Sequence, residues 1–438
     1  MPSSPHAHPA PAPIIAAPAP IEVNVAPIKE EVTSDTTVAG ECPDGGLAAW
    51  LQVLGSFFLI FSTWGIFNSF GAFQTYYEDQ GLNTASAISW VGSVQGCILL
   101  FAGAITGPIF DMGYLHSLVA TGTILVVLGM MMTSLSTKYY EVILAQGVCV
   151  GLGAGCLFIP GLAIVSTYFQ KRRAAALGFA ISGSSIGGVV YSTVFRQLLE
   201  QVGFGWTTRV MGFIALATLS TSLAVMRRRV TTTHTRRKLF EAQAWKELPY
   251  TLFCIGNFLS FVGAYIPFFF LPAYASAHTN ASPTLAFYTL GILNGASTVG
   301  RVVPNFFADK TGPLNMLIPC AFITSILAFC WIPVNSVGSL ITFAVLYGVF
   351  SGALLALAPP SLASLTSDVS RVGTRMGMAF ALGGVGLLIG NPVAGALVNT
   401  ETGNYVRAQV FNGAIVMGAA IFMGLARVAV VGFRWVKV

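Results

Sequence analysis

The sequence predicts an all-α membrane protein, with twelve transmembrane helices in two pseudo-symmetric six-helix bundles. The first observation is composition, because 55% of the 438 residues are hydrophobic and only 9% are charged. Soluble domains carry about 25% charged residues. The second observation is a series of apolar runs, many close to the roughly 20 residues that a helix needs to cross a bilayer. The third is a set of landmarks that recur half a chain apart, as in membrane proteins built from two related halves.

The apolar runs divide into two sets of six. Helices are expected to begin near Leu47, Thr84, Leu115, Val142, Ala174 and Thr208, and then near Leu252, Leu285, Leu314, Val337, Thr374 and Val406. The widest internal gap contains two basic clusters and separates the two sets. We therefore expect a first bundle at 44–226, a cytoplasmic loop at 227–250 and a second bundle at 251–438.

The first 43 residues differ from the rest of the chain. They are polar, rich in Pro and Ala and poor in aromatic residues, a composition typical of disordered segments. They lack the basic start and apolar core of a signal peptide. We expect 1–43 to form a disordered cytoplasmic tail, with the first spanning helix acting as the insertion signal.

Basic residues concentrate in alternate loops, for example at Lys171–Arg173 and Arg227–Arg229. Cytoplasmic loops of membrane proteins are enriched in Lys and Arg. Both chain ends are therefore expected in the cytoplasm, with the plasma membrane as the default location. The chain has a net charge of +6, and its basic residues sit in short clusters between apolar runs, a pattern that favours contact with anionic lipid over nucleic acid. The sequon at Asn280 falls on the outer side and makes it a candidate glycosylation site, although Pro283 follows it closely.

Landmarks of the first half return in the second after about half the chain. Gly107–Asp111 leaves the second apolar run, and Asn305–Gly312 leaves the eighth. Gly178 in the fifth run matches Gly377 in the eleventh at a similar offset. A repeat of this length predicts two related bundles with a binding site between them.

Several motifs resemble those of the monocarboxylate porters, a branch of the major facilitator superfamily, in their fungal form. Asp44–Trp50 resembles the entry motif of the first helix, and Trp64–Tyr77 resembles the fungal version of its remainder. Tyr168–Ser185 resembles the second signature of the family, and Ala308–Gly312 resembles the general superfamily loop motif. The resemblance implies a transporter fold of two rocking bundles.

The sequence also departs from that family. Leu47 and Met112 stand where its motifs usually have an aromatic and a basic residue, respectively. Asn68 falls where the animal porters resemble one another in carrying a lysine linked to proton coupling. Arg301 matches the family's substrate-linked arginine, but Ser297 replaces the aspartate one turn earlier. The resemblance therefore implies the transporter fold and leaves lactate-like specificity and proton symport open.

Arg301 is the first candidate for substrate binding. It lies within the apolar run from Leu285 to Ala308, where a charge costs roughly 3 kcal/mol on insertion scales. Its guanidinium can hold a carboxylate through two parallel hydrogen bonds. The alternative is that Arg301 reaches the cytoplasmic end and pairs with Asp111, Asp309 or a lipid phosphate.

Five further polar residues are candidates for contacts with an oxygen-rich solute. They are Asn68, Gln74, Asn257, Tyr265 and Asn294. The resemblance implies that the first and seventh helices line the cavity. Each residue is equally consistent with an interhelical hydrogen bond, worth about 0.6 kcal/mol.

Charged residues at the cytoplasmic ends of the helices are candidates for a gating network. They are Asp111, Asp309, Lys310, Arg172 and Arg173. Such a network would stabilise one access state of the carrier. The alternative is solvated loop charge, because surface ion pairs contribute only about 0–1 kcal/mol.

Nothing in the sequence indicates catalysis or a bound cofactor. The motifs HExxH and GxxxxGK[ST] are absent, and the seven cysteines form no CxxC pair. We expect no enzyme, no metal site and no direct drive by ATP. The span centres also lack Asp, Glu and His, the usual proton relays, so protons remain an open coupling partner and a facilitator is a serious hypothesis.

Three functions remain after these exclusions. The first is transport of a small mono- or dicarboxylate by a monomeric carrier, which follows from the resemblance and Arg301. The second is export of a fungal secondary metabolite, which follows from the sparse, weakly charged cavity. The third, from another class, is a transporter-like nutrient sensor or receptor, which would be expected to add a long cytoplasmic extension.

Overall fold

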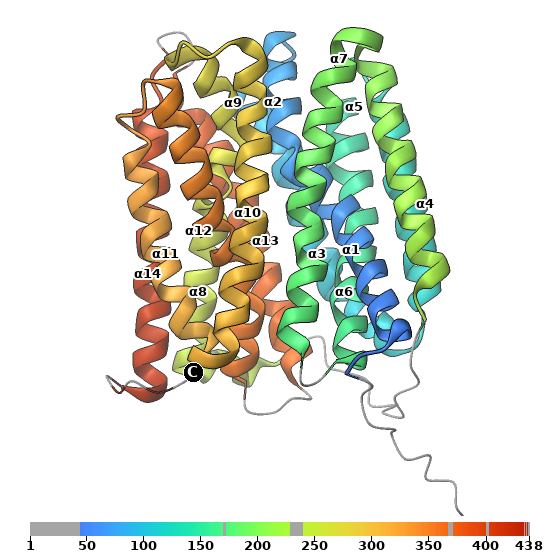
Figure 1. The fold of residues 1–438 in the computed structure, drawn as a ribbon, viewed down its shortest axis with the longest axis vertical. Helices are drawn as coiled ribbons and strands as arrows, with labels where there is room; N and C mark the ends of the chain where they lie inside the picture. Colours follow the sequence, from blue (N-terminus) through green and yellow to red (C-terminus); the bar gives the residue numbers. More distant parts are fainter. Residues whose placement is uncertain are drawn as a thin grey trace, which may run out of the picture. The chain divides into compact units, whose positions relative to one another are not determined.

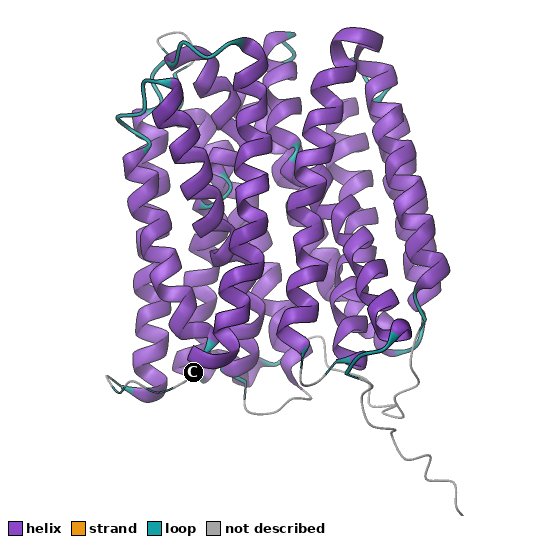
Figure 2. Cartoon of the chain, in the orientation of Figure 1, coloured by secondary structure: helices purple, strands orange, loops and turns teal. Residues whose placement is uncertain are grey.

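The computed structural model describes residues 44–169, 172–227, 240–366, 371–399, 403–432, 434 and 436. Within these residues all regular secondary structure is helical, apart from one isolated bridge between Asn399 and Asn404 (Figure 2). The expected tail and half of the expected loop at 227–250, residues 228–239, lie outside the described residues. The side chains of Arg173 and Asp309 do so as well.

Six spanning segments make up the first half. Their helices are α1 (Leu47–Asn68), α2 (Phe70–Asp79), α3 (Ala85–Asp111), α4 (Leu115–Thr133), α5 (Tyr139–Val142), the π-helical η1 (Ile143–Val150), α6 (Gly151–Tyr168) and α7 (Arg173–Val225). Helices α1 and α2 form one span that breaks at Ser69, and α5, η1 and α6 form another. The range of α7 holds two helices, because Gly203 has a φ of 75° and a ψ of 171°. Glycine takes such a left-handed φ without steric cost.

The second half also has six spanning segments. A short 3₁₀ helix η2 (Ala242–Lys246) precedes α8 (Leu248–Gly263), α9 (Ile266–His278), α10 (Pro283–Thr311), α11 (Pro313–Cys330), α12 (Val337–Ser364), α13 (Val372–Leu397) and α14 (Val406–Val431). Helices α8 and α9 form one span that breaks at Ala264 and Tyr265. The breaks in the first and seventh spans therefore correspond.

Ten stretches of the described chain are long and apolar enough to cross a membrane. One of them covers both helices of α7, and α10 is not among the ten although it has 29 residues. Its apolar character is diluted by Arg301, Asn305 and the charged end of the helix. With α7 counted as two crossings and α10 added, the segments match the twelve expected and confirm the all-α membrane fold.

The two halves repeat one order of helix contacts. In the first half α1 packs on α7, α3 on α6, and α4 on both α6 and α7. In the second half α8 packs on α13 and α14, α10 on α12, and α11 on both α12 and α14. The halves meet where α3 packs on α13, α7 on α10, and α2 on α9. The fold is thus two pseudo-symmetric helical bundles, as the repeated landmarks predict.

Consecutive spans run in opposite directions, so every second connection lies at the same end of the helices (Figure 1). At one end the backbone N–H of Asp44 donates to the Tyr168 carbonyl at 3.2 Å, and the Gln52 amide donates to the Val225 carbonyl at 3.2 Å. We call this the basic end, because Arg172, Arg227, Lys310 and Arg371 lie there. The other end, where α2 and α9 terminate, is the opposite end.

Side-chain caps fix the starts of three helices at the opposite end. The hydroxyl of Thr84 accepts from the Ala87 N–H at 3.3 Å, and that of Ser282 accepts from the Leu285 N–H at 3.2 Å. Ser336 caps α12 in the same way. Such caps satisfy N–H groups that lack a partner in the first helical turn.

Candidate functional site

A central cavity lies between the two halves and has an empty volume of about 430 Å³, including its part open to solvent. Its lining residues are Ile60, Trp64, Phe158, Leu162, Ile181, Phe261, Tyr265, Arg301, Leu355, Pro359 and Phe380. The first five come from the first half and the other six from the second half. Pockets between helical bundles are common ligand sites, and Arg301 is the one charged residue of this lining.

Arg301 lies inside the protein with only 4% of its surface exposed. Its Nε donates to Ser297 Oγ at 3.1 Å on its own helix, and its Nη1 donates to Ser184 Oγ at 2.5 Å on α7. Within the described residues Nη2 makes no hydrogen bond of ordinary geometry, and the Tyr265 hydroxyl also interacts with this guanidinium. Ten residues, or about 15 Å of helix, separate Arg301 from the end of α10. The structure therefore places this guanidinium at the cavity, away from the helix end.

Tyr265 also reaches the central cavity, from the break between α8 and α9. Its ring lies nearly parallel to that of Trp64, with 6.0 Å between centroids and 19° between planes. It stands in the same relation to Phe261, at 6.2 Å and 22°. The break in the helix thus presents an aromatic side chain from the second half to the first.

Asn68 and Asn294 do not line the cavity and are connected to Arg301 through Ser184. The Asn68 amide donates to the Ser184 carbonyl at 3.2 Å, and the Asn294 amide donates to the Asn68 carbonyl at 3.4 Å. The amide oxygens of both residues are buried without a partner among the described residues. A polar cluster around Ser184 thus joins α1, α7 and α10.

The structure does not bring Gln74 or Asn257 to Arg301. The Gln74 amide donates to Glu78 and to the Ala85 carbonyl, the latter at 3.0 Å, close to the opposite end. The Asn257 amide donates to the Ala379 carbonyl at 3.1 Å and ties α8 to α13. Both residues hold helices together in this conformation.

The expected gating residues lie at or near the basic end of the helices. Arg172 is exposed, and the Lys310 ammonium lies 6.0 Å from the centroid of the exposed Phe306 ring. Asp111 is half-buried at the end of α3. The gating role of Asp111, Asp309, Lys310, Arg172 and Arg173 stays a prediction.

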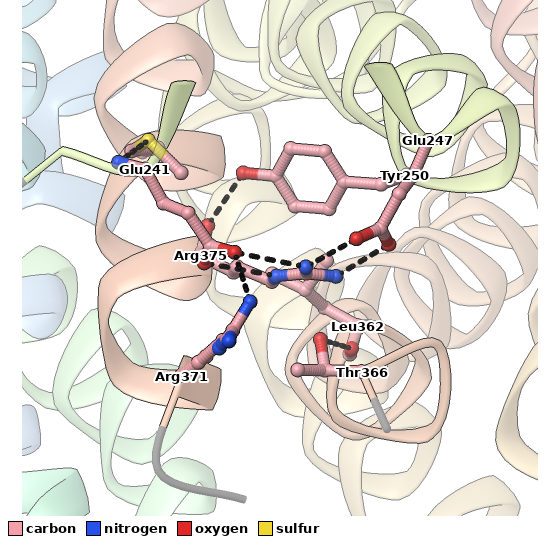
Figure 3. Close-up of polar contacts among 8 residues, drawn as sticks. Glu241, Glu247, Tyr250, Leu362, Thr366, Arg371 and Arg375 are labelled. Atoms are coloured by element: carbon pink, nitrogen blue, oxygen red, sulfur yellow. Dashed lines mark hydrogen bonds and ion pairs between the residues drawn. The ribbon is translucent and has the colours of Figure 1, made fainter. Parts of the chain in front are cut away.

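A different charge cluster, which sequence reasoning missed, is formed at the basic end by Arg375 with Glu241 and Glu247 (Figure 3). Arg375 donates to both oxygens of Glu247, at 2.5 and 2.7 Å, and to both oxygens of Glu241, at 3.1 and 3.2 Å. Arg371 donates to Glu241 at 3.0 Å, and the Tyr250 ring lies beneath the Arg375 guanidinium at 5.5 Å. The hydrogen bonds from Arg375 lower the pKa of Glu241 below its ordinary value.

This cluster attaches the segment before α8 to α13, so we call it the linker clasp, defined as Arg375, Glu241 and Glu247. The backbone N–H of Glu241 also contacts the Met378 sulfur at 3.4 Å. Arg375 is buried, and bidentate arginine–carboxylate pairs are the geometrically specific kind of ion pair. The signal in the sequence was an arginine in the first turn of an apolar helix with two glutamates just before the seventh span.

Two remaining predictions concern the surface and metals. Asn280 is exposed in the connection between α9 and α10 at the opposite end, so it is accessible. Its glycosylation stays a prediction. Among the described residues no group of three His, Cys, Asp or Glu side chains is arranged to hold a metal ion.

Comparison with known proteins adds family information to this geometry. The family described as Major Facilitator Superfamily matches residues 53–337 and 253–437. The MFS-type transporter dbaD of Emericella nidulans is 44% identical over 87% of both chains. The aspyridones efflux protein apdF of the same organism is 40% identical over 89% of this chain and 80% of its own. The MFS transporter asaE of Aspergillus flavus is 35% identical over 90% of both chains.

Proposed function

We propose that this chain, which belongs to the major facilitator superfamily, exports a small organic secondary metabolite by alternating access. It is a multi-pass membrane transporter and not an enzyme. The observation that carries the proposal is the central cavity, whose lining is apolar apart from Arg301 and Tyr265. The efflux role in the name of the 40% identical relative favours the outward direction.

Both halves of the protein contribute residues that can contact a bound solute. A mainly apolar lining favours a solute with a sizeable apolar body. The unpartnered Nη2 of Arg301 supplies one charged donor toward an anionic or strongly polar group. Because both halves contribute lining residues, rocking one half against the other changes access to the bound solute.

The conformation described here is closed at the opposite end. There α2 packs on α9, and the rings of Phe70 and Phe269 lie 4.9 Å apart across the two halves. The Ser86 hydroxyl donates to the Pro392 carbonyl at 2.9 Å, from α3 to α13. We infer that solute enters from the basic end in this state and leaves after the contacts at the opposite end part.

A second candidate is transport of a small mono- or dicarboxylate. The observation that favours it is the unpartnered Nη2 of Arg301 together with the resemblance to the monocarboxylate porters. A small carboxylate would leave most of the apolar lining without contact, which weakens this candidate. The names of the relatives described above give it no support.

The test is to delete the gene in the organism that carries it and to compare metabolites in the medium and the cells. We expect one metabolite to fall in the medium and rise in the cells, with recovery by the wild-type gene and not by Arg301→Ala. Phe306→Leu is the matched control, since Phe306 is exposed on α10 and outside the cavity. An unchanged metabolite profile, combined with saturable uptake of a carboxylate into proteoliposomes, would replace the export proposal with the second candidate.

A further inference from the structure

Five aromatic side chains form a closed ring around the central cavity. They are Trp64, Phe158, Phe380, Phe261 and Tyr265, and all five line the cavity. In this order each ring contacts the next, and Tyr265 contacts Trp64, with centroid distances between 5.6 and 6.3 Å. We call these five residues the aromatic belt. Trp64 and Phe158 belong to the first half and the other three to the second.

The rings of the aromatic belt present both faces and edges. Trp64 and Phe261 each lie nearly parallel to Tyr265, with interplanar angles of 19° and 22°. The contacts of Phe380 with Phe158 and Phe261 are edge to face, at 82° and 81°. Aromatic rings attract one another through offset stacking and through edge-to-face contacts, beyond the effect of buried area alone. A planar conjugated solute can use both kinds of contact, whereas a saturated solute of the same size can use neither.

The charge beside the aromatic belt selects for an anion. Arg301 lines the same cavity, and the groups that interact with it are the neutral hydroxyls of Ser184, Ser297 and Tyr265. No described carboxylate lines the cavity. A buried guanidinium with one free donor nitrogen is stabilised by an anion that hydrogen-bonds to it.

We propose that the central cavity binds a planar conjugated organic anion, with its rings against the aromatic belt and its acidic group on Nη2 of Arg301. This deepens the proposed export function and rests on it, because it takes the central cavity as the transport site. It divides recognition between two features: the belt distinguishes conjugated from saturated bodies, and Arg301 distinguishes anions from neutral compounds.

The test compares one planar conjugated anion with two analogues, each of which differs from it in one property. They are 2-naphthoate, its saturated analogue decahydro-2-naphthoate and its neutral analogue 2-naphthamide. Binding to the purified full-length protein in lipid nanodiscs is measured by isothermal titration calorimetry. We expect 2-naphthoate to bind about fivefold more tightly than the saturated acid and at least about tenfold more tightly than the amide. Equal affinity of either analogue with 2-naphthoate, or no binding of 2-naphthoate to wild type, would overturn the proposal.

Two variants assign the discrimination to the residues named. Phe261→Leu is expected to reduce the preference for 2-naphthoate over its saturated analogue severalfold. Arg301→Gln is expected to remove the preference over 2-naphthamide. Phe306→Leu is the matched control for the loss of a ring outside the cavity, and it should keep both preferences. Retention of both preferences in Phe261→Leu and Arg301→Gln would contradict the assigned site.

The outcome for binding is separable from the outcome for export. If the three probes bind as expected but gene deletion changes no exported metabolite, the export function fails and the class of ligand stands. If deletion changes an exported metabolite while 2-naphthoate binds no better than its analogues, export stands and the inference fails.

Discussion

The guanidinium of Arg301 is held by hydroxyl groups, and this decides how the residue can act. Ser184 and Ser297 accept from two of its nitrogens without neutralising its charge. A carboxylate in the place of either serine would form an internal ion pair. The positive charge that the cavity offers to a solute therefore depends on the serines as much as on the arginine.

Ser297→Asp tests this dependence. The substitution places a carboxylate one helical turn from Arg301, where Nε already donates to the residue 297 side chain at 3.1 Å. We expect affinity for 2-naphthoate to fall about tenfold or more, because the new carboxylate competes with the acid group of the solute. Ser297→Ala is the control; it adds no charge and should change affinity only a few-fold. If both variants lost a similar amount of affinity for 2-naphthoate, the affinity would depend on the Ser297 hydroxyl and not on the charge of the neighbouring side chain.

The sequence predicts Arg301 but not its partners. A lone arginine in an apolar run is conspicuous, since a charge there is costly. Ser184 lies 117 positions away, and its contact with Arg301 depends on the rotation of α7 against α10, which no local pattern encodes. The aromatic belt could not be predicted for a related reason. The chain has 32 phenylalanines, and composition does not tell which of them face a cavity and which face lipid.

At the scale of helices, closure of the opposite end depends on Gly71 in α2. A Cβ at this position would lie 2.2 Å from the carbonyl oxygen of Phe268 in α9, so only glycine allows this approach. We expect Gly71→Ala to disfavour the closed conformation by about 1–3 kcal/mol, the usual cost of overpacking. The population should then shift toward a state open at the opposite end.

The measurement is the distance between spin labels at Lys138 and Asn335, which are exposed at the opposite end in different halves. Gly71→Ala should lengthen the main distance. Gly338→Ala is the control, because a Cβ there meets no atom within 4 Å. An unchanged distance distribution in Gly71→Ala would mean that this contact does not limit opening.

The linker clasp should restrain the segment that precedes α8. Arg375→Gln removes the ion pairs that hold Glu241 and Glu247 to α13. We expect hydrogen exchange in the peptide 240–250 to rise about tenfold, because local opening no longer breaks the partly buried ion pairs of Arg375. Arg371→Gln is the graded control and should have a smaller effect, since its side chain is half exposed and surface ion pairs contribute little.

The stability that the linker clasp contributes should also depend on pH. Because the pKa of Glu241 is lowered from 4.5 in the folded protein, its ion pair contributes stability that is present above pH 4.5 and is lost as the pH falls through the lowered value. Exchange corrected for its intrinsic pH dependence should therefore rise in wild type below pH 4.5. Arg375→Gln should show a much smaller rise, and equal rises in both proteins would exclude this role for Glu241.

At the scale of the whole molecule, the sequence predicts the repeat but not the break in the first span. Landmarks at matching offsets predict two halves, and the helix contacts repeat between them. The break at Ser69 has no proline nearby, whereas Gly263 and Pro267 flank the break at Ala264 and Tyr265 and are a local signal for it. Both breaks arise where α2 and α9 pack across the halves, a constraint that exists only in the assembled fold.

The basic end also predicts the orientation of the molecule in its membrane. Arg172, Arg227, Lys310 and Arg371 lie at one end of the helices, and cytoplasmic surfaces are the ones enriched in such residues. We expect a membrane-impermeant maleimide to label Asn335→Cys in intact cells and to label Lys310→Cys only after permeabilisation. Both variants are made with Cys330→Ala, because Cys330 is exposed near the opposite end. The same protein without an introduced cysteine serves as the background control, and the reverse labelling pattern would place the basic end outside the cell.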